Sequence, residues 1–205
     1  MVEQKATNVT WHNSVLTRQD RERLLNQKGY VIWFTGVPAS GKSTLANTVA
    51  VLLHKRKHHT CVLDGDNLRC GLNKNLGFSA EDRKENVRRV SEVAKLFADA
   101  GTIAIVALAS PYRTDRDKAR KLIGEKRFVE IFVECPYHIC EERDPKGLYK
   151  KAHAGEIKEF TNVSAPYEVP LKPEIIVNTA DLSVIESGQK IITFLEQAGL
   201  IPSEK

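Results

Sequence analysis

The stretch that decides the fold is Gly36-Val37-Pro38-Ala39-Ser40-Gly41-Lys42-Ser43-Thr44. It fits the pattern G-x-x-x-x-G-K-[ST] in full, with an apolar, strand-like run (30–35) before it and apolar residues at helical spacing (45–53) after it. A strand, a glycine turn and a helix in this order form a phosphate cradle, because N–H groups of the turn and the positive end of the helix converge on phosphate oxygens. The stretch therefore predicts a nucleoside triphosphate site.

Two side chains of this stretch have distinct expected roles. Lys42 should reach the β- and γ-phosphates, and the Ser43 hydroxyl should ligate Mg²⁺. A glycine-rich turn that binds nothing is the alternative, and the flanking strand and helix disfavour it. The expected ATP-binding residues of the loop are Gly36, Ser40, Gly41, Lys42, Ser43 and Thr44.

The composition is that of an ordinary soluble protein, with 41% hydrophobic and 28% charged residues in 205. The net charge of +5 is spread along the chain without an aromatic-interleaved basic stripe, so nucleic acid is not an expected partner. No apolar run approaches the roughly 20 residues that cross a bilayer, so no membrane is expected either. The polar start (1–13) resembles neither a signal nor a transit peptide, and the four cysteines lack C-x-x-C spacing; a cytoplasmic protein with reduced thiols is expected.

Strand-like and helix-like segments alternate along the rest of the chain. This alternation predicts an α/β fold: a parallel sheet flanked by helices on both faces, of the P-loop nucleoside triphosphate hydrolase/kinase type. We expect an N-terminal extension with a short helix (1–29) and a single kinase domain (30–205). The expected strands are 30–35, 60–64, 102–108, 127–133 and 174–177, and the expected helices are 18–27, the helix after the loop to about 57, 80–100 capped by Ser79, 114–123, 135–143 and 182–198 capped by Asp181.

Two segments fall outside the alternation. Residues 65–78 are rich in turn formers, and 144–170 has little hydrophobic period but many charges. A solvated surface loop is one interpretation of 144–170. A lid is the other, because enzymes that transfer phosphoryl groups must exclude water, and so long a loop is uncommon in a compact domain.

Several long motifs in a fixed order resemble the adenylyl-sulfate kinases, over nearly the whole chain from about Thr10. They are 63–69 (Leu-Asp-Gly-Asp-Asn-Leu-Arg), 71–73 (Gly-Leu-Asn), 76–79 (Leu-Gly-Phe-Ser), 82–86 (Asp-Arg-Lys-Glu-Asn), 110–112 (Ser-Pro-Tyr), 143–151 (Arg-Asp-Pro-Lys-Gly-Leu-Tyr-Lys-Lys) and 155–158 (Gly-Glu-Ile-Lys). The resemblance implies ATP and Mg²⁺ as cofactors and phosphorylation of the ribose 3′-hydroxyl of adenylyl sulfate, giving 3′-phosphoadenylyl sulfate and ADP. It also implies a homodimer that serves sulfate activation or assimilation.

The resemblance also implies residue roles by position in these motifs. Some of these residues are expected to bind the acceptor nucleotide, and others are expected to contact the phosphoryl group that is transferred. The implied roles are adenylyl sulfate binding for Arg69, Arg83 and Asn86, stacking on its adenine for Phe78 and Phe160, a lid position for Lys146, ATP binding for Arg143, contact with the transferring phosphoryl group for Asp64 and Asp66, and a phosphoserine for Ser110.

Chemistry supports most of these roles independently. A substrate with two anionic groups beside an adenine needs arginine forks and aromatic faces. Asp64, at the end of a strand, should hold a Mg²⁺-bound water, whereas solvation or turn formation is the alternative for either aspartate of the pair. Asp66 should orient the 3′-hydroxyl rather than act as a strong base, because nearby cations depress a carboxylate pKa that is ~3.9 to begin with. Orientation is sufficient when the transition state is loose.

Ser110 and Phe160 invite further interpretation. Ser110 has no evident base beside it, and direct transfer between two bound nucleotides needs no covalent intermediate, so a structural or substrate-contacting role is expected. Phe160 stands in an otherwise charged segment, where it is expected to lack a core to join until a ligand supplies one. Three departures from the resembled pattern, Pro38 in the loop, His153 in the lid and 162–164 (Asn-Val-Ser), should modify affinity or substrate inhibition without removing activity.

Two other functions stay open at this point. One is another small-substrate kinase of the same fold, such as a nucleoside monophosphate kinase. The other is a non-catalytic nucleotide-binding domain that regulates a sulfate-activating complex. The run 64–69 and the two phenylalanines disfavour the first, and the intact Lys42, Ser43 and aspartates disfavour the second.

Overall fold

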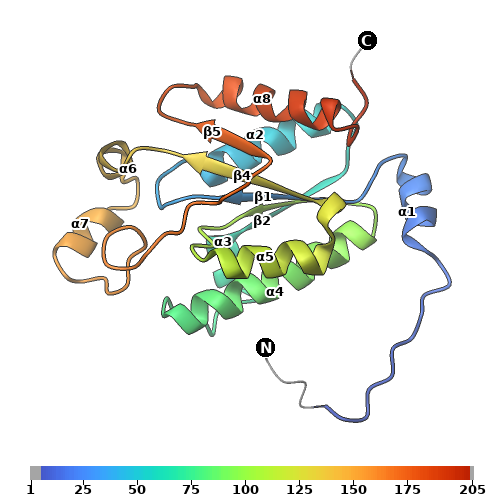
Figure 1. Cartoon of the computed structure of the whole chain (residues 1–205), viewed down its shortest axis with the longest axis horizontal. Helices are drawn as coiled ribbons and strands as arrows, with labels where there is room; N and C mark the ends of the chain where they lie inside the picture. The colour runs from blue at the N-terminus through green and yellow to red at the C-terminus, as the bar shows by residue number, and fades with distance from the viewer. Residues whose placement is uncertain (1–5, 204–205) are drawn as a thin grey trace.

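The computed structural model describes residues 6–203. A five-stranded sheet in the order β2-β3-β1-β4-β5 forms its centre, and every adjacent pair of strands is parallel. Helices α2 and α8 cover one face of the sheet, and α4 and α5 cover the other (Figure 1). The predicted fold class is confirmed.

The elements follow the predicted alternation. The strands are β1 (Val31–Thr35), β2 (Thr60–Asp64), β3 (Ile103–Ala107), β4 (Phe128–Glu134) and β5 (Ile175–Asn178). The helices are α1 (Arg18–Leu25), α2 (Lys42–Lys55), α3 (Gly65–Arg69), α4 (Ala80–Asp99), α5 (Arg113–Ile123), the short 3₁₀ turn η1 (Glu125–Arg127), α6 (Tyr137–Arg143), α7 (Leu148–His153) and α8 (Val184–Gln197).

The central strand β1 shows why both faces need a helical layer. All five of its residues are buried. Ile32 and Phe34 pack into the core on the α2 and α8 side, whereas Val31 and Trp33 belong to the core beneath α4 and α5. Successive side chains of a strand point to opposite faces, so a strand that is apolar throughout requires cover on both sides.

Helix ends follow local capping chemistry, with one correction. The Ser79 hydroxyl accepts a hydrogen bond from the Asp82 backbone N–H, as predicted for the start of α4. At α8 the predicted cap Asp181 is wrong. Ser183 forms a capping box with Glu186, whose carboxylate reaches back to the Ser183 N–H, and this reciprocal pair sets the helix start two residues later.

The N-terminal helix α1 also ends differently from the prediction. Asn26, in the left-handed region at φ 49°, terminates it before Gly29. The helix rests on Gly101, where an added Cβ would lie 3.1 Å from a Leu25 methyl, and Gln27 donates a hydrogen bond to the Gly101 carbonyl at 2.7 Å. Gly101 thus follows the end of α4 and, because it has no side chain, allows α1 to pack closely against it.

The two segments outside the alternation contain more structure than predicted. Residues 65–69 form α3, because the Asp64 carboxylate caps the first N–H groups of that turn. The segment 144–170 contains α7 and its own small apolar cluster with the phosphate loop. In Figure 1, α6 and α7 lie beyond the carboxyl ends of the strands.

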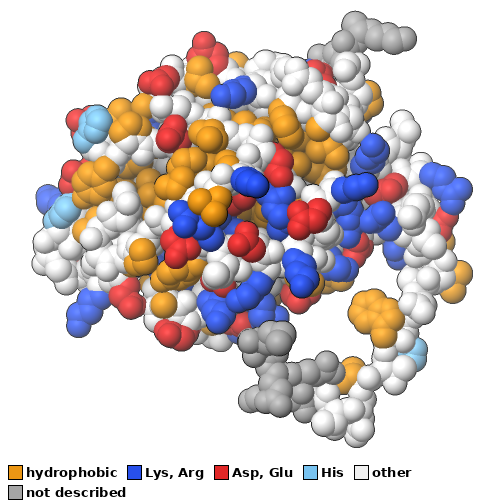
Figure 2. Space-filling view, in the orientation of Figure 1, with side chains coloured by type: hydrophobic (Ala, Val, Ile, Leu, Met, Phe, Trp, Pro, Cys, Tyr) orange, Lys and Arg blue, Asp and Glu red, His pale blue; other side chains and the backbone are white. Residues whose placement is uncertain are grey.

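The surface offers two simple observations. On the face shown in Figure 2, Lys and Arg side chains are interspersed with Asp and Glu over α4 and α5, and hydrophobic side chains gather near β4 and β5. Within residues 6–203, none of the helices combines the length and the apolar character that crossing a bilayer requires.

Candidate active site

The phosphate loop joins β1 to α2 at the carboxyl edge of the sheet. A Cβ on Gly36 would lie 2.6 Å from the Val133 carbonyl oxygen of β4, so only glycine allows this close approach. Gly41, at φ 94°, occupies the left-handed region and starts α2 without a side-chain cap. The first N–H groups of α2 are therefore free to bind an anion, which is the geometry that the sequence predicted.

Lys42 lies across this loop. Its ammonium donates to the Val37 carbonyl at 2.7 Å and reaches the Ser40 hydroxyl at 3.4 Å. Desolvation within the loop lowers the pKa of Lys42 to about 8, against the weaker opposing effects of Cys140 and Asp64. A triphosphate in the loop would place negative charge beside the Lys42 ammonium and would raise this pKa again.

This shift predicts a pH dependence of ATP binding. Below pH 8 the Lys42 ammonium is already charged, so binding needs no proton; above pH 8 each binding event must take one up. The dissociation constant of ATP should therefore be flat from pH 6.5 to 7.5 and rise toward about tenfold per pH unit above 8. Calorimetry in two buffers of different ionisation enthalpy measures the proton uptake directly. An affinity that stays constant to pH 9.5 would contradict the assignment.

Ser43 and Asp64 form the candidate magnesium site. The Ser43 hydroxyl donates to Asp64 Oδ2 at 2.6 Å. Two oxygen atoms that could ligate a hard cation therefore lie side by side at the start of α2. The other oxygen, Oδ1, accepts from the backbone N–H groups of Asp66 at 3.0 Å and Asn67 at 3.5 Å, so the carboxylate is fixed. Mg²⁺ is usually held by one or two such protein oxygens together with phosphates and water, and these residues fit it. Within residues 6–203 no denser cluster of His, Cys, Asp and Glu offers a metal site.

Asp66 lies exposed at the start of α3. Lys146, from the predicted lid, forms an ion pair with it. Both side chains are more than half exposed, so this pair contributes little stability and can open readily. Asp66 is therefore available to an incoming hydroxyl at the cost of one weak ion pair.

Arg69, Phe78 and Arg83 form a second cluster, at the start of α4. The guanidinium of Arg69 lies 4.4 Å and that of Arg83 5.6 Å from the centre of the Phe78 ring. Backbone carbonyls hold both in place: Arg69 donates to Leu76 and Gly77, and Arg83 donates to Phe78 at 2.8 Å and to Glu159 at 2.7 Å. Burial lowers the pKa of both arginines, and for Arg83 the charge of Arg69 adds to this effect. Two cations beside one exposed aromatic ring form a site suited to an anionic nucleotide.

Two predicted substrate residues are placed differently from this cluster. Asn86 is buried, and its side-chain oxygen accepts from the Asn73 amide at 3.0 Å, so it supports the turn 70–77. Phe160 is 6% exposed and packs edge-on against Tyr149 at 5.0 Å. The expectation that Phe160 has no core to join is wrong, because it packs in a buried cluster with Cys140, Tyr149 and Val37 of the phosphate loop.

Ser110 is committed to the protein interior. It is 3% exposed at φ 38°, and its Oγ accepts from the Trp33 indole N–H at 3.0 Å and donates to the Thr35 hydroxyl at 3.0 Å. The Thr35 hydroxyl in turn donates to the Ala109 carbonyl at 2.7 Å and lies 3.0 Å from the Tyr167 hydroxyl, and burial raises the pKa of that phenol to about 12. Ser110 therefore lacks the neighbouring base that activates a nucleophilic serine.

We expect the substitution Ser110→Ala to lower stability more than turnover. It leaves the buried Trp33 N–H without its acceptor, which costs about 1–3 kcal/mol in unfolding free energy. Loss of a covalent nucleophile would instead reduce kcat by roughly 10⁴–10⁶. Denaturant unfolding and steady-state kinetics separate the two. A folded variant without detectable turnover would restore the phosphoserine interpretation.

Arg143 reaches the phosphate loop through a residue that the sequence did not single out. It donates to the Thr179 carbonyl at 2.6 Å and to its hydroxyl at 3.1 Å, and the Thr179 hydroxyl donates to the Ser40 carbonyl at 3.0 Å. Tyr149 was missed as well; its hydroxyl donates to the Pro38 carbonyl at 3.1 Å. The one available signal for Thr179 was its place directly after β5, at the ligand-binding edge of the sheet.

A comparison with protein families assigns the chain. The family model described as adenylylsulphate kinase matches residues 28–178, a range that runs from before β1 to the end of β5. The chain belongs to the adenylylsulphate kinase family. The match includes the phosphate loop, both aspartates and the arginine cluster.

Relatives in this family align over almost their whole length. The adenylyl-sulfate kinase of Staphylococcus haemolyticus is 54% identical over 197 residues, which are 96% of this chain and 99% of the relative. That of Penicillium chrysogenum is 53% identical, over 98% of this chain and 99% of the relative. Among solved structures, the Mycobacterium tuberculosis APS kinase CysC in complex with AMPPNP and APS superimposes with a TM-score of 0.80 at 46% identity, over 83% of this chain and 99% of that one.

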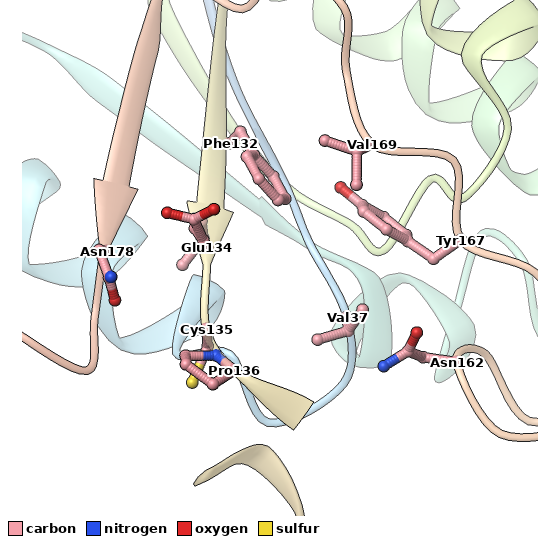
Figure 3. A pocket seen from close by; sticks show the side chains of 10 residues that line it. Val37, Phe132, Glu134, Cys135, Pro136, Asn162, Tyr167, Val169 and Asn178 are labelled. Carbon is pink, nitrogen blue, oxygen red and sulfur yellow. The ribbon is translucent and has the colours of Figure 1, made fainter. Parts of the chain in front are cut away.

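In this member of the adenylylsulphate kinase family, a separate cavity of about 410 Å³ lies behind the phosphate loop. Figure 3 shows Tyr167 and Val169 facing Phe132 of β4 across it, with Val37 at one side. The Tyr167 ring stacks on Phe132 at 6.1 Å. None of the predicted substrate residues lines this cavity.

Proposed function

We propose that this chain phosphorylates adenylyl sulfate with its phosphate loop at one end of the site and its paired arginines at the other. It is an ATP-dependent kinase of sulfate activation, which transfers the γ-phosphoryl group of ATP to the ribose 3′-hydroxyl of adenylyl sulfate and releases 3′-phosphoadenylyl sulfate and ADP. The observation that supports the residue assignment is the location of Asp64 and Asp66. Asp64 ends β2 and caps α3, the short helix that carries Asp66 and Arg69, and its carboxylate accepts a hydrogen bond from Ser43 of the loop.

We propose the following roles at the transferring group. The loop N–H groups and Lys42 bind the β- and γ-phosphates, and Arg143 borders the ATP side through Thr179. Ser43 and Asp64 would hold Mg²⁺, directly or through a water, and the ion would neutralise phosphate charge. Asp66 accepts a hydrogen bond from the ribose 3′-hydroxyl and so orients the 3′-oxygen toward the γ-phosphorus of ATP. Positioning and charge neutralisation of this kind are sufficient for a loose phosphoryl transfer.

On the acceptor side, the two guanidiniums and the Phe78 ring are the proposed contacts of adenylyl sulfate. Phe78 is 55% exposed, so one face of its ring is open to an adenine. Phe160 lies one residue beyond Glu159, whose carbonyl Arg83 holds, and is the proposed second aromatic neighbour. Asn86 supports the cluster indirectly, because its side-chain oxygen accepts a hydrogen bond from Asn73 and so fixes the turn 70–77.

We propose that 144–170 is a lid on a single kinase domain (30–205), with 1–29 as an extension. Three contacts support this: Lys146 pairs with Asp66, the Tyr149 hydroxyl binds the Pro38 carbonyl, and the Glu159 carbonyl binds Arg83. The lid thus contacts both nucleotide sites. Exclusion of water from ATP is the expected consequence.

We also propose a homodimer that works in the cytoplasm. Apolar side chains on the extension are strongly exposed, Trp11 at 84% and Val15 at 96%, and a second copy would bury them. One structural relative is described as a hexameric APS kinase from Thiobacillus denitrificans. The four cysteines are free, as suits a reducing compartment. Light scattering of the full chain should give twice the mass of one chain; the mass of a single chain would refute the dimer.

A coupled ADP-release assay tests the acceptor. Adenylyl sulfate, AMP, CMP and adenosine are offered separately with MgATP, and adenylyl sulfate should give by far the highest kcat/KM. The arginine pair faces an anionic nucleotide and disfavours adenosine, which carries no charge. Preference for AMP or for a nucleoside would overturn the proposal while leaving the fold intact.

Arg83→Ala should impair acceptor use specifically. The loss of one charge-assisted contact raises the KM for adenylyl sulfate about 10- to 100-fold, because such bonds contribute about 1.5–3 kcal/mol. The KM for ATP should change less than twofold, a bound set by the distance of Arg83 from the phosphate loop contacts. Arg88→Ala, on the same helix and paired with Glu85 and Glu92, is the matched control. Equal losses for both substrates in Arg83→Ala would count against its role.

A further inference from the structure

Arg116 of α5 is a buried cation that the mechanism above does not use. Its side chain is 2% exposed, and each nitrogen of the guanidinium has a separate partner. Nε donates to Glu130 Oε1 at 2.7 Å, Nη1 to the Ser110 carbonyl at 2.6 Å, and Nη2 to the Glu168 carbonyl at 2.7 Å. One planar group therefore connects β4 with two segments of irregular backbone.

One of these segments, 110–112, follows β3, and its Tyr112 acts electrostatically on Arg83 of the arginine cluster. The other, 167–169, is the C-terminal end of the proposed lid. They also bind each other: the Glu168 N–H donates to the Pro111 carbonyl at 2.8 Å, and the Glu168 carboxylate accepts from the Arg113 N–H at 2.8 Å. Tyr167 adds a hydrogen bond with Thr35 at the end of β1. Arg116 lies at the centre of this connection.

The backbone of Ser110 explains why a fixed donor is needed there. Its φ of 38° lies in the left-handed region, which is unfavourable for a non-glycine residue. Such a conformation persists only where the surroundings determine it. The Arg116 guanidinium fixes the carbonyl of Ser110 and Trp33 fixes its hydroxyl, so the turn has one arrangement.

We propose that Arg116 is a positioning residue for the acceptor nucleotide: it holds the turn 110–112 and the lid exit 167–169 in one register, so that the acceptor pocket and the lid are set together. This proposal rests on the proposed function, because it takes 110–112 as a border of the adenylyl sulfate site. Glu130 is the buried counter-charge that keeps the guanidinium aimed.

Arg120 provides a matched control one turn along α5. It pairs with Glu174 at 2.6 Å and with Glu130 at 3.4 Å, and also approaches the Phe128 carbonyl. It shares the buried network of Arg116, yet its hydrogen bonds among the described residues lead to neither 110–112 nor 167–169. Substitution of either arginine should therefore lower general stability, whereas only substitution of Arg116 should disturb the positioning of these two segments.

The test compares Arg116→Lys with Arg120→Lys. Lysine keeps the charge opposite Glu130 but cannot span two carbonyls. For Arg116→Lys we expect the KM for adenylyl sulfate to rise about tenfold, with the KM for ATP within about twofold of the parent value. For Arg120→Lys both constants should stay near the parent values. Equal effects of the two substitutions, or equal effects on the two substrates, would overturn the proposal.

A spectroscopic measurement is independent of the reaction. The chain has two tryptophans, and the indole N–H of one of them, Trp33, donates to Ser110. The NMR resonance of this indole N–H therefore reports on the turn. It should shift in Arg116→Lys and stay in place in Arg120→Lys. If the parent enzyme rejects adenylyl sulfate, the proposed function fails, and the indole resonance still decides whether Arg116 sets the turn. Should Arg116→Lys not fold, Glu168→Ala removes the carboxylate that accepts from the Arg113 N–H, loosens the connection between the same two segments, and must raise the same KM; an unchanged KM would overturn the proposal.

Discussion

Replacement of Lys42 by methionine should reduce kcat by about 10²–10³-fold, the cost of removing one preorganised charge from a site of charge development. The ammonium lies within the loop at 2.7 Å from the Val37 carbonyl, where the β- and γ-phosphates are expected. Methionine has a similar length and no charge, so the substitution tests electrostatics rather than packing. Steady-state kinetics at saturating ATP and adenylyl sulfate provide the measurement.

Two comparisons keep this result interpretable. Lys55→Met, at the exposed far end of the same helix, should leave kcat within about twofold, as is usual for surface changes. The fold of Lys42→Met should persist, because its native contacts are one carbonyl and one hydroxyl of the loop itself. If the variant is folded and its kcat falls by less than a factor of about ten, phosphate stabilisation by Lys42 is refuted.

Asp64→Asn is expected to have the second largest effect. The amide oxygen can still accept from the Asp66 N–H, so α3 keeps its cap, but the negative charge beside Ser43 is lost. We expect kcat to fall about 10²-fold or more and the Mg²⁺ concentration for half-maximal rate to rise, because a neutral amide is a weaker ligand for a hard cation.

The measurement is a magnesium titration of the initial rate. Asp99→Asn is the matched control; Asp99 ends α4 at the opposite edge of the sheet and pairs with Lys95 and Arg127. Its magnesium curve should match that of the parent enzyme. An Asp64→Asn curve that also matches would exclude a role for Asp64 near the ion.

The fold was predictable because its strongest signals are local. The loop 36–44 predicts a strand before it and a helix after it, and largely apolar strands that alternate with helices are typical of a parallel sheet covered by helices on both faces. Capping chemistry fixed Ser79 for the same reason. It failed at Asp181, because an aspartate and a nearby serine are equally good caps in sequence, and only the Glu186 side chain decides between them.

The site was predictable where a motif specifies a position and not where packing does. Ser43 and Asp64 come together, as the loop motif and the place of Asp64 at the end of a strand implied. Phe160 was misjudged, since its partners Val37, Cys140 and Tyr149 are distant in sequence and no periodic pattern connects them. Arg116 carried no signal either: on a charged helix it resembles Arg113 and Arg120, and only the fold shows that it is the one that enters the interior.

The most direct test of the account is a crystal structure of the chain with a non-hydrolysable ATP analogue, Mg²⁺ and adenylyl sulfate. The account predicts the triphosphate in the loop 36–44, the acceptor between Arg69, Arg83 and Phe78, and the ribose 3′-hydroxyl at hydrogen-bond distance from Asp66 and in line with the γ-phosphate. A structure in which adenylyl sulfate binds away from the two arginines, or with its 3′-hydroxyl facing away from the γ-phosphate, would contradict it.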